Sequence, residues 1–283
     1  TVMIDKATKF KQLHTLGEAF IMANSWNAWN AGSAVMLEEA GFEANATTSA
    51  GVAYSHALPD YAGRLSFHTA LVETRRIAEV VRIPVSMDAE NGYGDTPESV
   101  FENMQKIVAT GVVGASIEDY SGNKDKPLYS IDLAVERIRS AKAAIADSNT
   151  AFILTARAEC FLTGHPNAFA ESVNRVNRYQ EAGADCLFVP GISNIAMIKE
   201  LVKEVNGPIN VVMGLSGTPI SLAQLKDAGV TRISIGGSLA RATFALVKSA
   251  AKEMLEKGTF KFADQQIADE ELGRLFSKPS VKE

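Results

Sequence analysis

The sequence lacks the features that would place the protein in a membrane, in an oxidising compartment or on a nucleic acid. None of its 283 residues lies in an apolar run of the roughly 18 residues that a membrane span needs, and residues 1–14 lack the apolar centre of a signal peptide. The sequence has only two cysteines, Cys160 and Cys186, which are too few for a disulfide framework. The net charge of −5 comes without a basic cluster, which argues against a nucleic-acid partner. We expect a cytoplasmic protein that binds neither membranes nor nucleic acids.

A Gly-x-Gly-x-x-Gly motif is also missing after the first predicted strand, which argues against a doubly wound dinucleotide fold. Short apolar segments instead alternate with amphipathic ones across the whole chain. This alternation predicts a single α/β domain over residues 1–283, a (β/α)8 TIM barrel with a C-terminal helical tail at about 258–283. The predicted strands are 19–23, 42–49, 83–87, 112–117, 151–156, 184–189, 209–213 and 232–235. The predicted helices are 10–16, 34–40, 67–82, 97–110, 131–146, 168–182, 195–205, 221–227, 239–257 and 264–276, with a polar loop at 51–60.

The third predicted strand ends in two acidic residues at alternate positions, Asp88 and Glu90. A period of two would place both carboxylates on the same side of the strand. Two like charges that face one space are costly unless a cation lies between them, and oxygen ligands suit Mg²⁺ or Mn²⁺. The alternative is an N-cap cluster for the helix at Pro97, but Asp95 or Thr96 already fills that role. The pattern therefore favours a metal or acid–base function for Asp88 and Glu90.

In a barrel of this kind the carboxyl ends of all strands open onto one face, where the chemistry takes place. Three acidic residues on this face, counting Glu118, would attract a divalent cation, and Arg157 would then bind an anion such as a carboxylate. Thr48 and Ser49 could hold the other end of the ligand. We therefore predict a small dicarboxylic or 2-oxo acid as substrate. The residues expected at this face are Asn27, Trp29, Thr48, Ser49, Asp88, Glu90, Glu118, Arg157, Glu159, Gly214, Ser216, Gly236 and Ser238.

Several alternatives remain open at this stage. Arg157 could form a structural ion pair with Glu118 or Glu159, and one of Glu118 and Asp119 is expected to be structural. The glycines after the last two strands could bind a phosphate, as in a phosphate-binding biosynthetic barrel. A third class of function is a barrel whose catalytic activity is weak and which serves mainly to bind a ligand. Cys160 is expected to be buried and inert, and only His56 and His165 lie on loops of the active face.

Six motifs resemble the isocitrate lyase/phosphoenolpyruvate mutase superfamily, in the same order from about Gly17 to Lys257. They are NAWNAGSA, TTSAGVAYSHALPD, DAENGYG, IEDY, TARAEC and SIGGSLARATF. The resemblance implies cleavage or formation of a C–C or P–C bond next to a 2-oxo acid, through a Mg²⁺-bound enolate. It also implies homodimers or homotetramers that exchange the last barrel helix.

The resemblance implies a role for each matching residue. Asp88 would hold Mg²⁺, and Glu90 and Glu118 would hold its waters. Arg157 would face the substrate carboxylate, Thr48 and Ser49 would contact the pyruvyl unit, and Asp60 would lie near the reacting group. We expect Trp29 to bind the substrate as well, and Arg157, Asp60 and Glu118 to be the catalytic residues.

Departures from the family pattern narrow the expected reaction. Isocitrate and methylisocitrate lyases carry Lys-Lys-Cys-Gly-His after the fourth strand, whereas residues 121–127 here read SGNKDKP. The gating motif of the mutases and hydrolases is not matched either, and Glu90 replaces the second aspartate of the family's Asp-x-Asp. The chain most resembles the oxaloacetate-decarboxylase-like branch. P–C chemistry on a phosphonopyruvate-like substrate is the alternative, and it depends on whether loop 120–129 can close over a phosphoryl group.

Overall fold

The chain folds into a closed barrel of parallel strands, seen in a computed structural model that describes residues 5–24, 29–60, 63–215 and 219–277. Every strand pairing is parallel, and the order is β1-β9-β8-β7-β6-β5-β4-β3-β2. Only Met22 separates β1 from β2, so the two ends of this order are halves of one strand and the sheet closes on itself. The TIM-barrel prediction is confirmed. The strands are β1 (Phe20–Ile21), β2 (Ala23–Asn24), β3 (Asn45–Ala46), β4 (Val85–Asp88), β5 (Gly114–Glu118), β6 (Ile153–Arg157), β7 (Cys186–Phe188), β8 (Ile209–Val212) and β9 (Arg232–Ser234).

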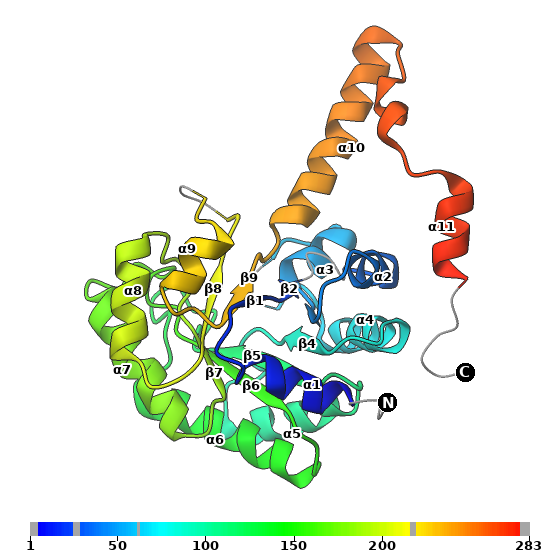
Figure 1. Cartoon of the computed structure of the whole chain (residues 1–283). Helices are drawn as coiled ribbons and strands as arrows, with labels where there is room; N and C mark the ends of the chain where they lie inside the picture. The colour runs from blue at the N-terminus through cyan, green and yellow to red at the C-terminus, as the bar shows by residue number, and fades with distance from the viewer. Residues whose placement is uncertain (1–4, 25–28, 61–62, 216–218, 278–283) are drawn as a thin grey trace.

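Helices surround the barrel and bury their apolar faces against it (Figure 1). Their starts follow local capping chemistry. The Thr96 side chain, for example, accepts the backbone N–H of Ser99 in a capping box, so Thr96 rather than Asp95 is the cap. The helices are α1 (Lys6–Leu13), α2 (Ala31–Glu39), α3 (Ser49–Ser55), α4 (Phe67–Val80), α5 (Pro97–Val108), α6 (Ile131–Asp147), α7 (Ala168–Glu181), α8 (Ile195–Glu204), α9 (Leu222–Asp227), α10 (Ser238–Lys257), the 3₁₀ turn η1 (Lys261–Gln265) and α11 (Asp269–Phe276).

Helix α1 closes the amino-terminal end of the barrel. Its Phe10 and Leu13 are buried in a cluster with Phe20, Val113 and Ile153, which belong to the beginnings of strands or the residues just before them. This apolar plug leaves only the opposite end, where the strands finish, open to a ligand.

Two predicted segments differ from the structure in ways that affect the site. The predicted strand 42–49 is reduced to β3, and the predicted loop after it begins with helix α3. The reason is local, because the Thr48 side chain accepts the N–H of Gly51 and starts a helix directly at the rim. Two further differences lie away from the site. The predicted strand 19–23 is interrupted at Met22, and the predicted helix 264–276 begins only at Asp269.

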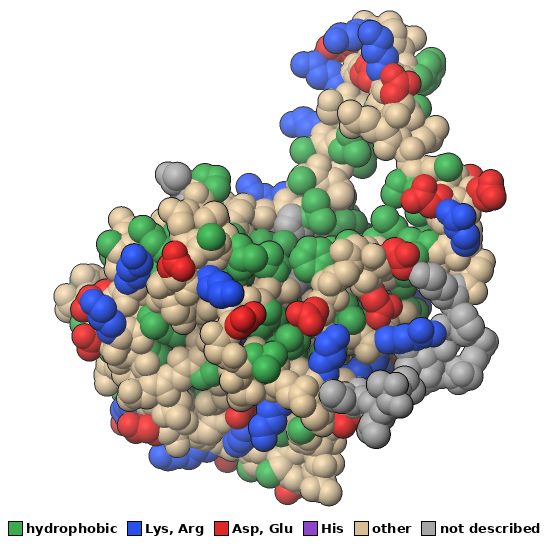
Figure 2. Space-filling model, viewed as in Figure 1, with side chains coloured by type: hydrophobic (Ala, Val, Ile, Leu, Met, Phe, Trp, Pro, Cys, Tyr) green, Lys and Arg blue, Asp and Glu red, His purple; other side chains and the backbone are tan. Residues whose placement is uncertain are grey.

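Helix α10 projects away from the barrel, and α11 returns to lie against α2 (Figure 1). The projecting helix exposes large apolar side chains, including Leu246, Val247 and Leu255 at 60%, 64% and 87%. Figure 2 shows hydrophobic side chains on this arm and on the barrel surface at its base. Within the described part of the chain, no helix is both long and apolar enough to cross a membrane.

Candidate active site

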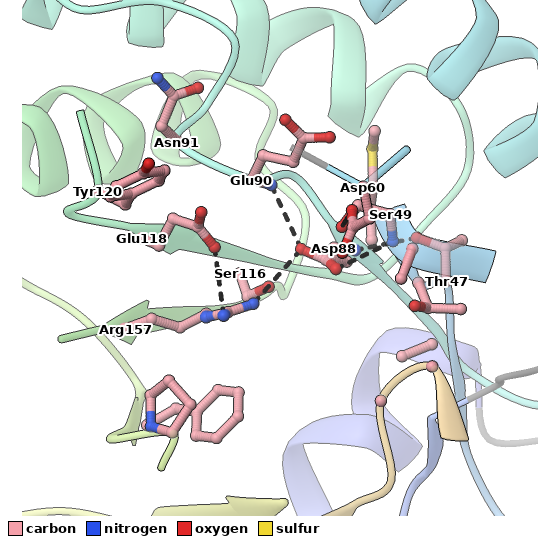
Figure 3. A pocket seen from close by; sticks show the side chains of 18 of the residues that line it. Thr47, Ser49, Asp60, Asp88, Glu90, Asn91, Ser116, Glu118, Tyr120 and Arg157 are labelled. Atoms are coloured by element: carbon pink, nitrogen blue, oxygen red, sulfur yellow. Dashed lines mark hydrogen bonds and ion pairs between the residues drawn. The ribbon is translucent and has the colours of Figure 1, made fainter. Parts of the chain in front are cut away.

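A pocket of about 710 Å³ opens at the carboxyl ends of the strands (Figure 3). Most of the residues predicted for this face line it. Gly214 and Ser238 do not line it. Neither does Trp29, which was expected to bind substrate and lies half-buried in the turn before α2. Asn27 and Ser216 fall outside the described residues. The predicted residues that the pocket brings together are Thr48, Ser49, Asp60, Asp88, Glu90, Glu118, Arg157, Glu159 and Gly236.

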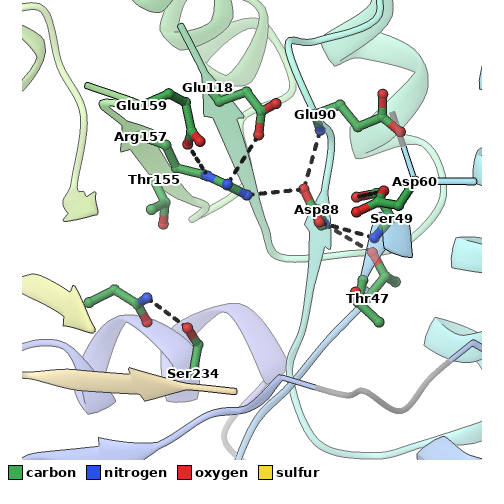
Figure 4. A network of polar contacts seen from close by, with 12 residues as sticks. Thr47, Ser49, Asp60, Asp88, Glu90, Glu118, Thr155, Arg157, Glu159 and Ser234 are labelled. Atoms are coloured by element: carbon green, nitrogen blue, oxygen red, sulfur yellow. Dashed lines mark hydrogen bonds and ion pairs between the residues drawn. The ribbon is translucent and has the colours of Figure 1, made fainter. Parts of the chain in front are cut away.

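Arg157, at the end of β6, contacts three carboxylates, which come from the ends of β4 and β5 and from just after β6 itself (Figure 4). Its Nε donates to Glu159 Oε1 at 2.9 Å, Nη2 lies 3.3 Å from Glu118 Oε2, and Nη1 lies 3.6 Å from Asp88 Oδ1. Burial opposes the charge, but Glu159, Glu118 and Asp88 outweigh it and raise the pKa of Arg157. The structural ion pairs considered for Arg157 are therefore present, and its guanidinium still borders the pocket.

Asp88 is fixed in position by the adjacent strand end. Its Oδ2 accepts the backbone N–H of Ser49 at 3.0 Å, and its own N–H donates to Thr47 Oγ1 at 2.9 Å. Ser49 also donates through Oγ to Asp60 Oδ1 at 3.0 Å. The start of α3 thus holds two carboxylates at the pocket wall. This gives a function to Thr47 and Ser49, which follow β3 directly.

Glu90 reaches the pocket by a different route from the one predicted. Strand β4 ends at Asp88, and Glu90 has φ +47°, so strand alternation does not place it. A non-glycine residue in this left-handed region is strained unless its surroundings impose the conformation. Arg137 provides part of that constraint by donating to the carbonyl oxygens of residues 91, 94 and 95. Asn103 donates to those of residues 92 and 93.

The carboxylates of the pocket repel one another. Burial, followed by the charges of Asp88 and Asp60, raises the pKa of Glu90 to about 7. Burial also raises the pKa of Glu118 well above its usual range, against the opposing effect of Arg157. Asp60 keeps accessible surface at the mouth, yet desolvation and the Asp88 charge raise its pKa as well. A bound cation would relieve this repulsion.

The donor chemistry fits Mg²⁺ held largely through water. Within the described residues, no three His, Cys, Asp or Glu side chains are close enough together to hold a metal by themselves. Mg²⁺ does not require such a cage, because it usually keeps several waters and binds one or two carboxylates. One direct ligand, Asp88, with Glu90 and Glu118 reaching its waters would satisfy that preference.

Other residues divide into those that the sequence analysis missed and those that play structural parts. Arg241, one turn into α10, also lines the pocket, and its place in the motif SIGGSLARATF was the signal that could have revealed it. Asp119 is structural, since it accepts hydrogen bonds from Tyr179 Oη at 2.5 Å and Arg175 Nη1 at 3.1 Å. Cys160 is buried, and burial raises its pKa to about 11.

The two histidines expected on loops of the active face, His56 and His165, are not among the residues that line the pocket.

Comparison with known protein families agrees with this geometry. The model of the phosphoenolpyruvate phosphomutase family matches residues 10–255. The chain belongs to this family. It is therefore an enzyme of the isocitrate lyase/phosphoenolpyruvate mutase superfamily, as its motifs indicated.

Curated relatives of this phosphomutase-family enzyme cover most of its length. The 2-methylisocitrate lyase of Escherichia coli strain K12 is 27% identical over 95% of the chain and 99% of the relative. The oxaloacetate decarboxylase of Pseudomonas entomophila strain L48 is 28% identical over 79% of the chain and 75% of the relative.

Solved structures of the superfamily share the whole architecture of the phosphomutase-family enzyme. A Burkholderia cenocepacia J2315 protein, described only as a lyase/mutase, is 41% identical with a TM-score of 0.92, over 97% of this chain and 96% of that one. A phosphonopyruvate hydrolase in complex with oxalate and Mg²⁺ is 26% identical with a TM-score of 0.83, over 96% and 95%.

Proposed function

We propose that the protein is a Mg²⁺-dependent lyase that cleaves a C–C bond next to a small 2-oxo acid, with oxaloacetate-type decarboxylation as its reaction. The observation that carries the proposal is the juxtaposition of Asp88, Glu118 and Arg157 at the end of one pocket. Carboxylates can hold the cation, and the arginine can hold a substrate carboxylate. The oxaloacetate decarboxylase relative and the Mg²⁺ and oxalate of the phosphonopyruvate hydrolase structure support it.

Each residue would have a defined part in this reaction. Asp88 would hold Mg²⁺ while Glu90 and Glu118 hold its waters, and the bound cation would act as a Lewis acid toward the 2-oxo oxygen. Glu159 fixes the Nε edge of Arg157, so the Nη edge is oriented toward the pocket and can bind the substrate carboxylate. Ser49 and the first turn of α3 would contact the other end of the substrate. Asp60 and Glu118, whose pKa values are raised, are suited to moving a proton to the enolate carbon.

The loop after β5 favours decarboxylation. It folds back on itself through a bridge between Tyr120 and Leu128 and a hydrogen bond from Ser121 N to Pro127 O at 2.7 Å. Residues 120–129 contain no cysteine or histidine, so the loop supplies no thiol acid. Decarboxylation of a 2-oxo acid needs an electron sink rather than such an acid. P–C cleavage remains the second candidate because Tyr120 and Gly122 of this loop border the pocket, where a phosphoryl group would bind.

The test is NMR of the purified protein with oxaloacetate, methylisocitrate, isocitrate and phosphonopyruvate, each with Mg²⁺, with EDTA and without enzyme. We expect Mg²⁺-dependent pyruvate from oxaloacetate. Asp88→Asn should abolish this turnover and leave the circular dichroism spectrum unchanged, whereas the exposed Asp132→Asn should behave as wild type. Phosphate from phosphonopyruvate would move the assignment to P–C chemistry. Full activity of Asp88→Asn would contradict the enolate mechanism.

We also infer that the protein is a homodimer or homotetramer in which α10 packs against a second copy. The helix after the last strand of a barrel normally covers the barrel wall, whereas α10 leaves it with Leu246, Val247 and Leu255 exposed. Val247→Glu should shift the mass measured by light scattering toward the monomer, and the neighbouring Lys248→Glu should not. A monomeric wild-type protein at micromolar concentration would refute the exchange.

A further inference from the structure

The pocket floor contains a second arginine, Arg232, on β9. Only 2% of its surface is accessible. Its guanidinium donates to Asn210 Oδ1 at 2.9 Å, to Thr155 Oγ1 at 2.9 Å and to His14 Nε2 at 3.1 Å. No aspartate or glutamate of the described residues lies within ion-pair distance of it. This arrangement contrasts with that of Arg157, which contacts three carboxylates.

The neighbours of Arg232 are neutral at physiological pH. His14 Nδ1 lies 2.7 Å from the carbonyl oxygen of Phe10 and must donate to it, which leaves Nε2 as the acceptor for Arg232. Burial and the Arg232 charge lower the pKa of His14 to about 3. The nearby thiol of Cys186 is neutral as well, because burial raises its pKa. Although burial lowers the pKa of Arg232, arginine remains protonated in proteins, so a positive charge stands uncompensated inside the barrel.

The pocket extends down to this charge. Its lining includes Arg232, Asn210, Ser234, Ser116 and Ser86, which give the floor polar side chains beside the apolar Met22 and Ala46. Thr155, the partner of Arg232, precedes Arg157 by two residues on β6, so the floor lies about 7 Å below the Arg157 layer.

The groups on the floor are suited to donate hydrogen bonds. The Ser234 hydroxyl oxygen accepts from Asn210 Nδ2 at 2.9 Å, so its own hydrogen is available to a ligand. Arginine also has more N–H groups than the three neutral partners of Arg232 use.

We propose that this floor is a separate anion-binding subsite, centred on Arg232, that takes a halide ion or a single carboxylate. An isolated buried charge is unfavourable, and a small anion at this position would supply the missing counter-charge. The subsite does not depend on which reaction the pocket catalyses.

The first test is crystallographic and uses the wild-type protein. Crystals soaked in sodium bromide should show an anomalous peak within hydrogen-bond distance of Arg232, with bromide as the probe. A second soak adds Mg²⁺ and oxalate. Loss of the peak then identifies a ligand carboxylate as the natural occupant, and a retained peak identifies a dissolved anion. Absence of bromide from Arg232 in both soaks would overturn the proposal.

The second test is in solution and compares two arginines of the same pocket. Melting temperature is measured against bromide concentration for wild type, Arg232→Met and Arg241→Met, with Arg241 at the pocket mouth as the control. The apparent bromide affinity should weaken at least tenfold in Arg232→Met and remain unchanged in Arg241→Met. An unchanged response in Arg232→Met, or one lost in Arg241→Met, would contradict the subsite. Should Arg232→Met not fold, Arg232→Lys keeps the charge, and the crystallographic test remains decisive.

Discussion

His14 should make the protein less stable as the pH falls below 7. The imidazole is 6% exposed, and its partners Phe10 O and Arg232 leave no acceptor for a second ring proton. Its pKa is about 3 in the folded protein, against 6.5 in the unfolded chain. Between these values the unfolded chain binds a proton that the native protein does not bind. The stabilising contribution is therefore complete above pH 6.5 and is lost progressively toward pH 3.

The size of the effect follows from the two pKa values. Linkage gives a loss of about 2 kcal/mol in the free energy of unfolding between pH 7 and pH 5. Because pH 5 lies well above the folded-state pKa, this figure depends almost entirely on the unfolded-state value. It is a substantial part of the stability of an ordinary domain.

The assay is urea unfolding of wild type and His14→Gln at pH 7 and pH 5, at one fixed protein concentration. Glutamine can still accept from Arg232 but does not titrate. The carboxylates of the pocket, whose pKa values are raised, change stability in the opposite direction and are common to both proteins. The difference between the two pH responses should therefore be about 2 kcal/mol. Parallel responses would show that His14 is protonated in the folded state and refute the neutral network around Arg232.

Further predictions concern the site. Arg157→Lys should raise KM for the 2-oxo acid about tenfold by losing the bidentate contact, measured by steady-state kinetics; an unchanged KM would exclude Arg157 from substrate binding. Arg137→Met should free the buried carbonyls of residues 91, 94 and 95 and lower stability by about 1–3 kcal/mol, with weaker Mg²⁺ binding by calorimetry. Mg²⁺ affinity equal to that of wild type would show that this turn does not contribute to metal binding. Removing Mg²⁺ with EDTA should lower the stability by about 2.7 kcal/mol relative to Mg²⁺ at one hundred times its Kd, an effect that Asp88→Asn should eliminate.

The sequence by itself determined the barrel and the composition of its active face. Strand and helix periods are local properties, so alternation along the chain could be read without coordinates. The carboxyl ends of parallel barrel strands share one face, and so Asp88, Glu118 and Arg157 could be placed together from their positions at strand ends.

The tertiary structure decided what depends on contacts between distant residues. Glu90 enters the pocket through a left-handed turn that Arg137 stabilises from 46 residues away at its farthest contact. The Arg232–His14 contact joins residues 218 positions apart, and no local pattern marks either one. The direction of α10 cannot be predicted from its local sequence either. Helix propensity explains why these residues are helical, but the surroundings of the helix decide where it packs. Local periodicity thus specified the elements and which strand ends meet, whereas side-chain contacts across the barrel set the charge balance on which the proposed chemistry depends.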